Sequence, residues 1–156
     1  MTIDARTTLW ETDLLADLIA RRHGLLGQLH ALGRRQVDLI EQGDMTQLLQ
    51  VLSVKHHLLA EVQQVEERLD PFRGQDPDAR PWRTSEARRQ CTELVGQSDV
   101  LLREILEQER LGELRLRQYR DEAASRLQMA HVAGHARTAY ADPSVNPARL
   151  DLSTEN

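Results

Sequence analysis

Residues 36–69, QVDLIEQGDMTQLLQVLSVKHHLLAEVQQVEERL, hold the end of one helical pattern, a two-residue break and the whole of a second helical pattern. Gly43 is typical of the residue that follows a helix C-terminus, and Asp44 is a favoured N-cap. Gln47 stands three residues after Asp44, which is the spacing of a capping box. So short a connection between two helices predicts an antiparallel helical hairpin.

Apolar residues recur along both helices of this hairpin at alternating steps of three and four, the spacing that keeps one stripe turned toward a neighbouring helix. The second helix, 44–69, carries Lys55 as a polar interruption in a stripe made of Leu48, Val51, Leu58, Val62, Val65 and Leu69. The first helix, from about 12 to 42, carries Arg22 and Gln36 as interruptions in a stripe made of Leu15, Leu18, Leu25, Leu29, Leu32 and Leu39. A wider apolar face on this helix predicts contact with more than one neighbour, through Leu14, Ile19, Leu26, Val37 and Ile40.

A loop rich in proline and glycine, 70–83, separates the hairpin from a third helical pattern over about 84–132. The apolar stripe of the third helix begins regularly and drifts out of the seven-residue repeat near Leu106. Leucine or isoleucine then recurs every eleven residues, at Leu94, Ile105, Leu116 and Leu127. Residues 134–156 show no periodicity and are expected to be a disordered tail. The predicted fold is therefore all-α: one elongated, coiled-coil-like three-helix domain over 1–133, followed by a tail.

Composition narrows the classes of function. The formal net charge is -5 and 3% of the residues are aromatic. A nucleic-acid-binding protein is not expected, because the arginines are interleaved with acidic residues and leave no extended basic face. The N-terminus lacks the pattern of a signal peptide and no segment is long and apolar enough to span a membrane, so a cytoplasmic location without membrane insertion is expected.

Catalytic and metal-binding patterns are weak. Cys91 is the single cysteine and falls on the apolar stripe, where a buried core residue is expected rather than a nucleophile. His131 and His135 have the i, i+4 spacing that can bring two imidazoles onto one ion, but without a third ligand nearby they are interpreted as solvated residues near a helix end. The sequence predicts no enzyme, no cofactor and no metal site.

The segment 36–69 resembles the FlgN-type flagellar export chaperones, through the Gly43-Asp44 step, the Leu-Leu-x-Val-Leu run at 48–52 and the Lys-x-x-Leu-Leu run at 55–59. With the third helix included, the resemblance covers about residues 12–130. It implies a cytosolic chaperone of flagellar type III secretion that binds C-terminal helical segments of the hook-filament junction proteins FlgK and FlgL before export. It also implies a tyrosine that contacts the export apparatus, for which Tyr119 is the candidate.

Client binding is expected on the third helix, at Leu101, Leu102, Ile105, Leu106, Leu111 and Leu114. An amphipathic client helix would lie along these residues. The alternative is a structural coiled-coil adaptor that self-associates as a homo-oligomer through the same stripes and has no client. For any one of these leucines, the competing interpretation is an ordinary place in the core.

Overall fold

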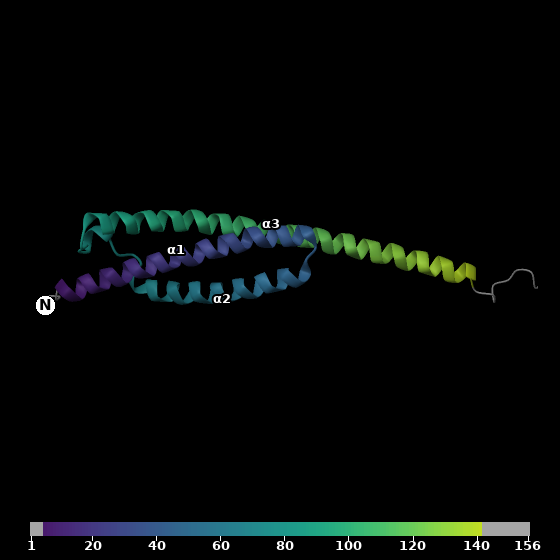
Figure 1. The fold of residues 1–156 in the computed structure, drawn as a ribbon, viewed down its shortest axis with the longest axis horizontal. Helices are drawn as coiled ribbons and strands as arrows, with labels where there is room; N and C mark the ends of the chain where they lie inside the picture. Colours follow the sequence, from purple (N-terminus) through teal and green to yellow (C-terminus); the bar gives the residue numbers. More distant parts are fainter. Residues whose placement is uncertain (1–4, 142–156) are drawn as a thin grey trace, which may run out of the picture. The chain divides into compact units, whose positions relative to one another are not determined.

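The computed structural model describes residues 5–141, and this range contains three long α-helices and no strand. The helices are α1 (Ala5–Gln42), α2 (Met45–Leu69) and α3 (Ser85–Ala141) (Figure 1). Two single turns of 3-10 helix, η1 (Asp70–Phe72) and η2 (Pro77–Ala79), lie in the proline-rich loop. The predicted all-α class, with a hairpin and a long third helix, is confirmed.

Two helix ends differ from the prediction. Within the described residues, the first helix begins at Ala5 rather than near residue 12. Thr12 is therefore an interior helical residue, and its buried hydroxyl donates a hydrogen bond to the carbonyl oxygen of Thr8 at 3.0 Å. The third helix ends at Ala141 rather than near residue 132. Residues 134–141 were expected to start the disordered tail but are helical. A helix tolerates the single Gly134, and no proline follows it before position 143. The rest of the predicted tail lies outside the described residues.

The chain divides into two compact units, with the boundary between Leu114 and Arg115 inside α3. The predicted domain over 1–133 spans this boundary. The reason for the division lies in the sequence of the second unit, in which no residue from 115 to 141 is buried. None of the helices within residues 5–141 has an apolar stretch long enough to cross a membrane.

The turn between α1 and α2 forms the predicted hairpin. Gly43 has a positive φ of 71°, which glycine adopts without steric cost, and its N–H bonds the carbonyl oxygen of Ile40 at 3.2 Å. The carboxylate of Asp44 accepts a hydrogen bond from the backbone N–H of Gln47 at 3.1 Å and so caps α2. The side chain of Gln47 does not complete a capping box, since its oxygen accepts a hydrogen bond from Arg35 at 3.0 Å.

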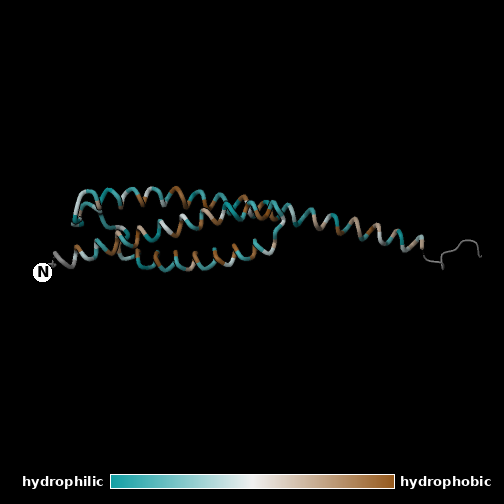
Figure 2. Tube along the Cα trace, viewed as in Figure 1, coloured by the Kyte–Doolittle hydropathy of each residue, from teal (hydrophilic) through white to brown (hydrophobic). Residues whose placement is uncertain are grey.

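The core of the first unit lies between α1 and α2 and extends to α3. It follows the predicted stripes, and on α1 Leu26 and Ile40 are buried beside the seam. Hydrophobic and hydrophilic residues alternate along α1 and α2 (Figure 2). The hairpin helices lie close together, whereas few Cα atoms in residues 85–114 of α3 come within 8 Å of those of α1 or α2. The fully or nearly fully buried apolar residues of the hairpin are Leu18, Leu25, Leu26, Leu29, Leu39, Ile40, Leu48, Val51, Leu58, Val65 and Leu69.

The polar interruptions of the stripes pair with one another. Arg22 of α1 forms an ion pair with Glu66 of α2. Lys55 of α2 is 6% exposed, and its ammonium donates to the side-chain oxygen of Gln36 of α1 at 2.7 Å and forms an ion pair with Glu109 of α3. The three helices of the first unit are therefore linked by one polar layer, in which Lys55 is buried and Glu109 is half-exposed.

The inner face of α3 carries small and polar residues. Its buried positions are Cys91, Ser98, Ile105 and Gly112, all at multiples of seven from one another, so the seven-residue register continues beyond Leu106. The expected drift was wrong because the seam is continued by the partly buried Gln108 and by Gly112, which an apolar pattern cannot reveal. Gln108 fits against Gly33 of α1, where an added Cβ would lie 2.9 Å from its amide carbon, and it donates to the carbonyl oxygen of His30 at 3.2 Å.

Replacement of Ser98 by alanine should stabilise the protein. The Ser98 side chain is fully buried and its hydroxyl makes no hydrogen bond within the protein. Replacing Ser98 with alanine removes an unsatisfied polar group without opening a large cavity, so we expect the free energy of unfolding to rise by about 1 kcal/mol and the midpoint of thermal unfolding by about 2–4 °C.

Thermal and urea unfolding followed by circular dichroism measure this change. The control is Ser53→Ala on the exposed face of α2, which makes the same gain in helix propensity, so the Ser98 variant should be stabilised by more than this control. A loss of stability in the Ser98 variant would show that its hydroxyl is satisfied in solution.

Candidate partner-binding surface

The structure divides the seven predicted binding residues into three groups. Ile105 is buried and Leu101 packs against the core, so these two belong to the fold and are withdrawn from the surface. Tyr119 is partly buried, with the Arg115 guanidinium 5.1 Å from its ring centre. The remaining four leucines are exposed to solvent, by 37% for Leu102, 61% for Leu106 and 47% for both Leu111 and Leu114.

These four leucines do not share one face of α3. At about 100° per residue, Leu102 and Leu106 lie about 40° apart, whereas Leu111 lies about 180° from Leu102 and Leu114 about 120° from it. A single client helix could not cover all four. The expected continuous client face is therefore reduced to Leu102 and Leu106.

Polar contacts show which helix each side of α3 faces. On one side of Ile105, Glu104 pairs with His30 of α1 at 2.7 Å. Gln108 lies on that same side and also bonds α1. On the other side, Glu109 pairs with Lys55 of α2. Leu102 is three residues before Ile105 and Leu106 is one residue after it. Both lie on the same side of α3 as Glu109, and that side is linked to α2.

Exposed leucines of α2 lie toward α3 in the same way. On one side of Leu58, Glu61 pairs with Arg21 of α1 at 3.4 Å, and on the other side Lys55 reaches α3. Leu59 stands on the side of Lys55, and Leu52 stands seven residues before it. Leu52 is 38% exposed and Leu59 is 51% exposed.

The exposed leucines of α2 and α3 are at matching heights. The two helices run in opposite directions (Figure 1) and Lys55 meets Glu109, so Leu59, four residues after Lys55, falls level with residue 105, between Leu102 and Leu106. We call Leu52, Leu59, Leu102 and Leu106 the leucine surface. Its residues lie on the sides of α2 and α3 that are linked by the Lys55–Glu109 pair.

Leu52 and Leu59, the α2 half of this surface, were not predicted from the sequence. Leu49, Leu52 and Leu59 each follow a seam residue directly, at Leu48, Val51 and Leu58. The doubled apolar positions were the available signal, since a helix with one partner needs only the first residue of each pair.

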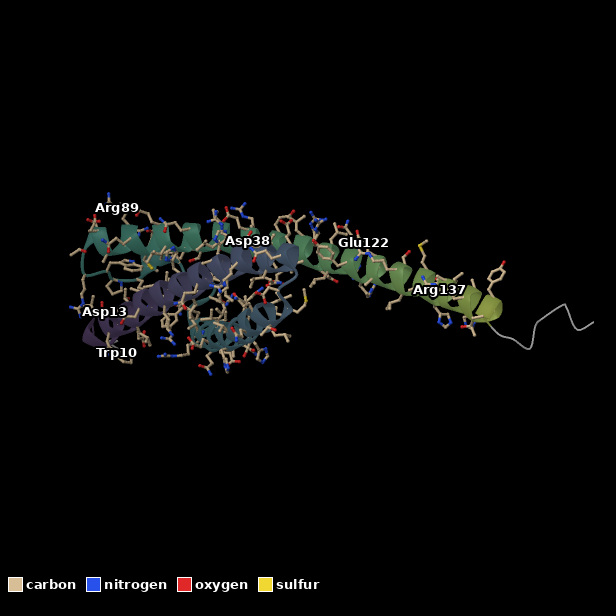
Figure 3. All side chains as sticks on the ribbon, turned by 45° about the vertical axis from the view of Figure 1, so that its right-hand side comes forward. Trp10, Asp13, Asp38, Arg89, Glu122 and Arg137 are labelled. Carbon is tan, nitrogen blue, oxygen red and sulfur yellow. The ribbon has the colours of Figure 1, made fainter. Side chains whose placement is uncertain are left out.

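An apolar cavity of about 270 Å³ lies beneath the loop at the other end of the first unit. Its lining includes Leu15, Phe72, Trp82 and Cys91. The indole N–H of Trp82 donates to the carbonyl oxygen of Pro77 at 3.1 Å, and burial raises the pKa of the Cys91 thiol. Cys91 is thus a buried core residue as predicted. Trp10, in contrast, is 64% exposed near the start of α1 (Figure 3).

In comparisons with known proteins, the chain matches no protein family, no curated protein and no solved structure. The resemblance to FlgN-type chaperones accordingly rests on the sequence features of residues 12–130 described above.

The free energy of unfolding should depend on pH through Lys55 and its partner Glu109. Burial lowers the pKa of Lys55, so between that lowered pKa and 10.5 the unfolded state binds more protons than the folded state, and stability rises with pH. In Glu109→Gln the ammonium loses its counter-charge and its pKa falls further. Because Glu109 is half-exposed, we expect a loss of about 1 kcal/mol at neutral pH that shrinks as pH rises and Lys55 becomes neutral.

Urea unfolding of the variant and the original chain at pH 7 and at pH 10 measures this difference. Glu107→Gln serves as the control, because Glu107 pairs with Arg110 on the solvent side of the same helix. A deficit that is unchanged or larger at pH 10 would contradict the assignment of Lys55 as the affected group.

Proposed function

We propose that this chain is a cytoplasmic export chaperone of the FlgN type, which binds a helical C-terminal segment of a hook-filament junction protein, FlgK or FlgL, on the leucine surface and acts by binding rather than by catalysis. The client helix would lie along α2 and α3 and add a fourth helix to the first unit. Its apolar side would meet Leu52, Leu59, Leu102 and Leu106.

The exposure of the leucine surface is the observation that supports this proposal best. Four leucines on the linked sides of α2 and α3 stay between 37% and 61% exposed, although the hairpin has buried its own seams. Covering their remaining area contributes on the order of 1 kcal/mol for each leucine. A total of about 4 kcal/mol would do no more than offset the cost of association. Further contacts of the client would have to add to it, and the modest strength suits a protein that must release what it carries.

Tyr119 would have a separate role in this proposal. It lies in the second unit and its ring is contacted by Arg115 of the same helix. The resemblance assigns it to contact with the export apparatus. Because Tyr119 is not one of the residues of the leucine surface, client and apparatus would contact different residues of the chain.

Paired substitutions on α3 test the client site. In Leu102→Asp with Leu106→Asp, two carboxylates replace the exposed leucines, and we expect at least about a tenfold loss of affinity for purified C-terminal segments of FlgK and FlgL, because burying a charge without a partner is costly. Isothermal titration calorimetry measures the affinity, and circular dichroism checks that helicity is kept.

The matched control is Leu111→Asp with Leu114→Asp. It makes the same change of residue type and charge on the same helix, away from α2, and should keep the affinity of the original chain. Equal losses in both variants, or no binding of either segment by the original chain, would contradict the proposal.

Self-association is the second candidate function, and the second unit favours it. Residues 115–141 form helix without any buried residue, yet they expose large apolar side chains, among them Leu127 at 72% and Met129 at 71%. Most of the stability of a helix in a protein comes from packing of its apolar face.

Light scattering over a dilution series separates the two candidates. The chaperone proposal predicts a monomer at low micromolar concentration that gains mass when a client segment is added. A dimer or tetramer that persists on dilution and gains nothing from the segment would favour the adaptor.

A further inference from the structure

His131 and His135 face one another on the exposed second unit. Their Nε2 atoms are 3.2 Å apart, and their rings are 4.5 Å apart between centres and nearly perpendicular, at 87°. Both residues lie inside α3, which continues to Ala141, so neither is at a helix end. The spacing alone had indicated two solvated histidines. The structure shows their two Nε2 atoms at hydrogen-bond distance from each other.

We propose that His131 and His135 bind one divalent transition-metal ion of the class that prefers imidazole, such as Zn²⁺ or Ni²⁺, through their two Nε2 atoms. Imidazole nitrogen is a preferred ligand of these ions. The inference is independent of the proposed function, since it uses no residue of the leucine surface.

The separation of the two nitrogens fits such an ion. Zinc lies about 2.0–2.1 Å from an imidazole nitrogen, so two nitrogens at the tetrahedral angle are about 3.3 Å apart and two at a right angle about 2.9 Å apart. The observed 3.2 Å lies between these values. Rotation of the rings to aim both lone pairs at the ion is then the main adjustment, and the helix backbone does not have to move.

The surroundings of the pair are uncharged. One turn before and one turn after it on the same side of the helix stand Leu127, Gln128, Thr138 and Ala139, so no cation on that side repels an incoming metal. Within the described part of the chain, no group of three or more His, Cys, Asp or Glu side chains gathers around an ion position. The remaining coordination positions would therefore be filled by water, and the affinity should be well below that of structural zinc sites with four protein ligands.

Titration of the full chain with ZnCl₂ and with NiCl₂ in a buffer that does not chelate metals tests the proposal. We expect saturable binding of one ion per chain by isothermal titration calorimetry, and binding should weaken at low pH because the ligand is the neutral imidazole. His131→Ala should lower the affinity of the chain for Zn²⁺ and Ni²⁺ about tenfold or more.

A variant with the same composition provides the control. His135→Ala combined with Ala136→His keeps two histidines but moves them to i, i+5, about 140° apart around the helix, and we expect it to lose the site as His131→Ala does. His56→Ala should keep the site, because His56 lies on α2. Absence of saturable binding by the original chain, or full affinity in the variant with shifted histidines, would overturn the proposal.

Discussion

The packing of α1 against α2 is the constraint on which the rest of the first unit depends. The hairpin is closed by Gly43 and Asp44, and its seams interlock over the length of α2. α1 is apolar on two sides and therefore also receives α3. α1 packs against both of the other helices. The leucines of α2 and α3 that do not face α1 therefore remain exposed. The leucine surface is a consequence of the hairpin geometry and of the doubled apolar positions on α2.

The polar layer of buried Gln36 and Lys55 and half-exposed Glu109 sets how α3 is placed on the hairpin. Apolar side chains can slide past one another at little cost, whereas a buried ammonium is costly unless it meets its partners. Lys55 has one partner on α1 and one on α3, so the three helices can satisfy it together in one register. Its height on α2 also places Leu59 between Leu102 and Leu106. A polar group of little net stabilising value thus determines which apolar residues share a surface.

Much of the fold could be predicted from the sequence because the hairpin obeys strong local rules. Leu18, Leu25, Leu29 and Leu58 are buried as their spacing indicated, and Gly43 ends α1 where glycine is favoured. The inner face of α3 beyond Ile105 was harder to predict, because Gln108 and Gly112 continue the seam without an apolar side chain. The candidate site was predicted only in part: Leu102 and Leu106 were included, but Leu101 and Ile105 face the core, and the α2 leucines depend on which helix lies beside them. The convergence of two histidine nitrogens is a matter of rotamer, which spacing does not specify.

Native-state hydrogen exchange on the free chain tests most directly whether the hairpin is closed on itself while α3 is held more loosely beside it. If it is, the amides at the α1 and α2 seams exchange with the free energy of global unfolding, and the amides of residues 91–112 in α3 exchange by a smaller opening at lower free energy. Equal protection of all three segments, or weaker protection of α2 than of α3, would contradict the account.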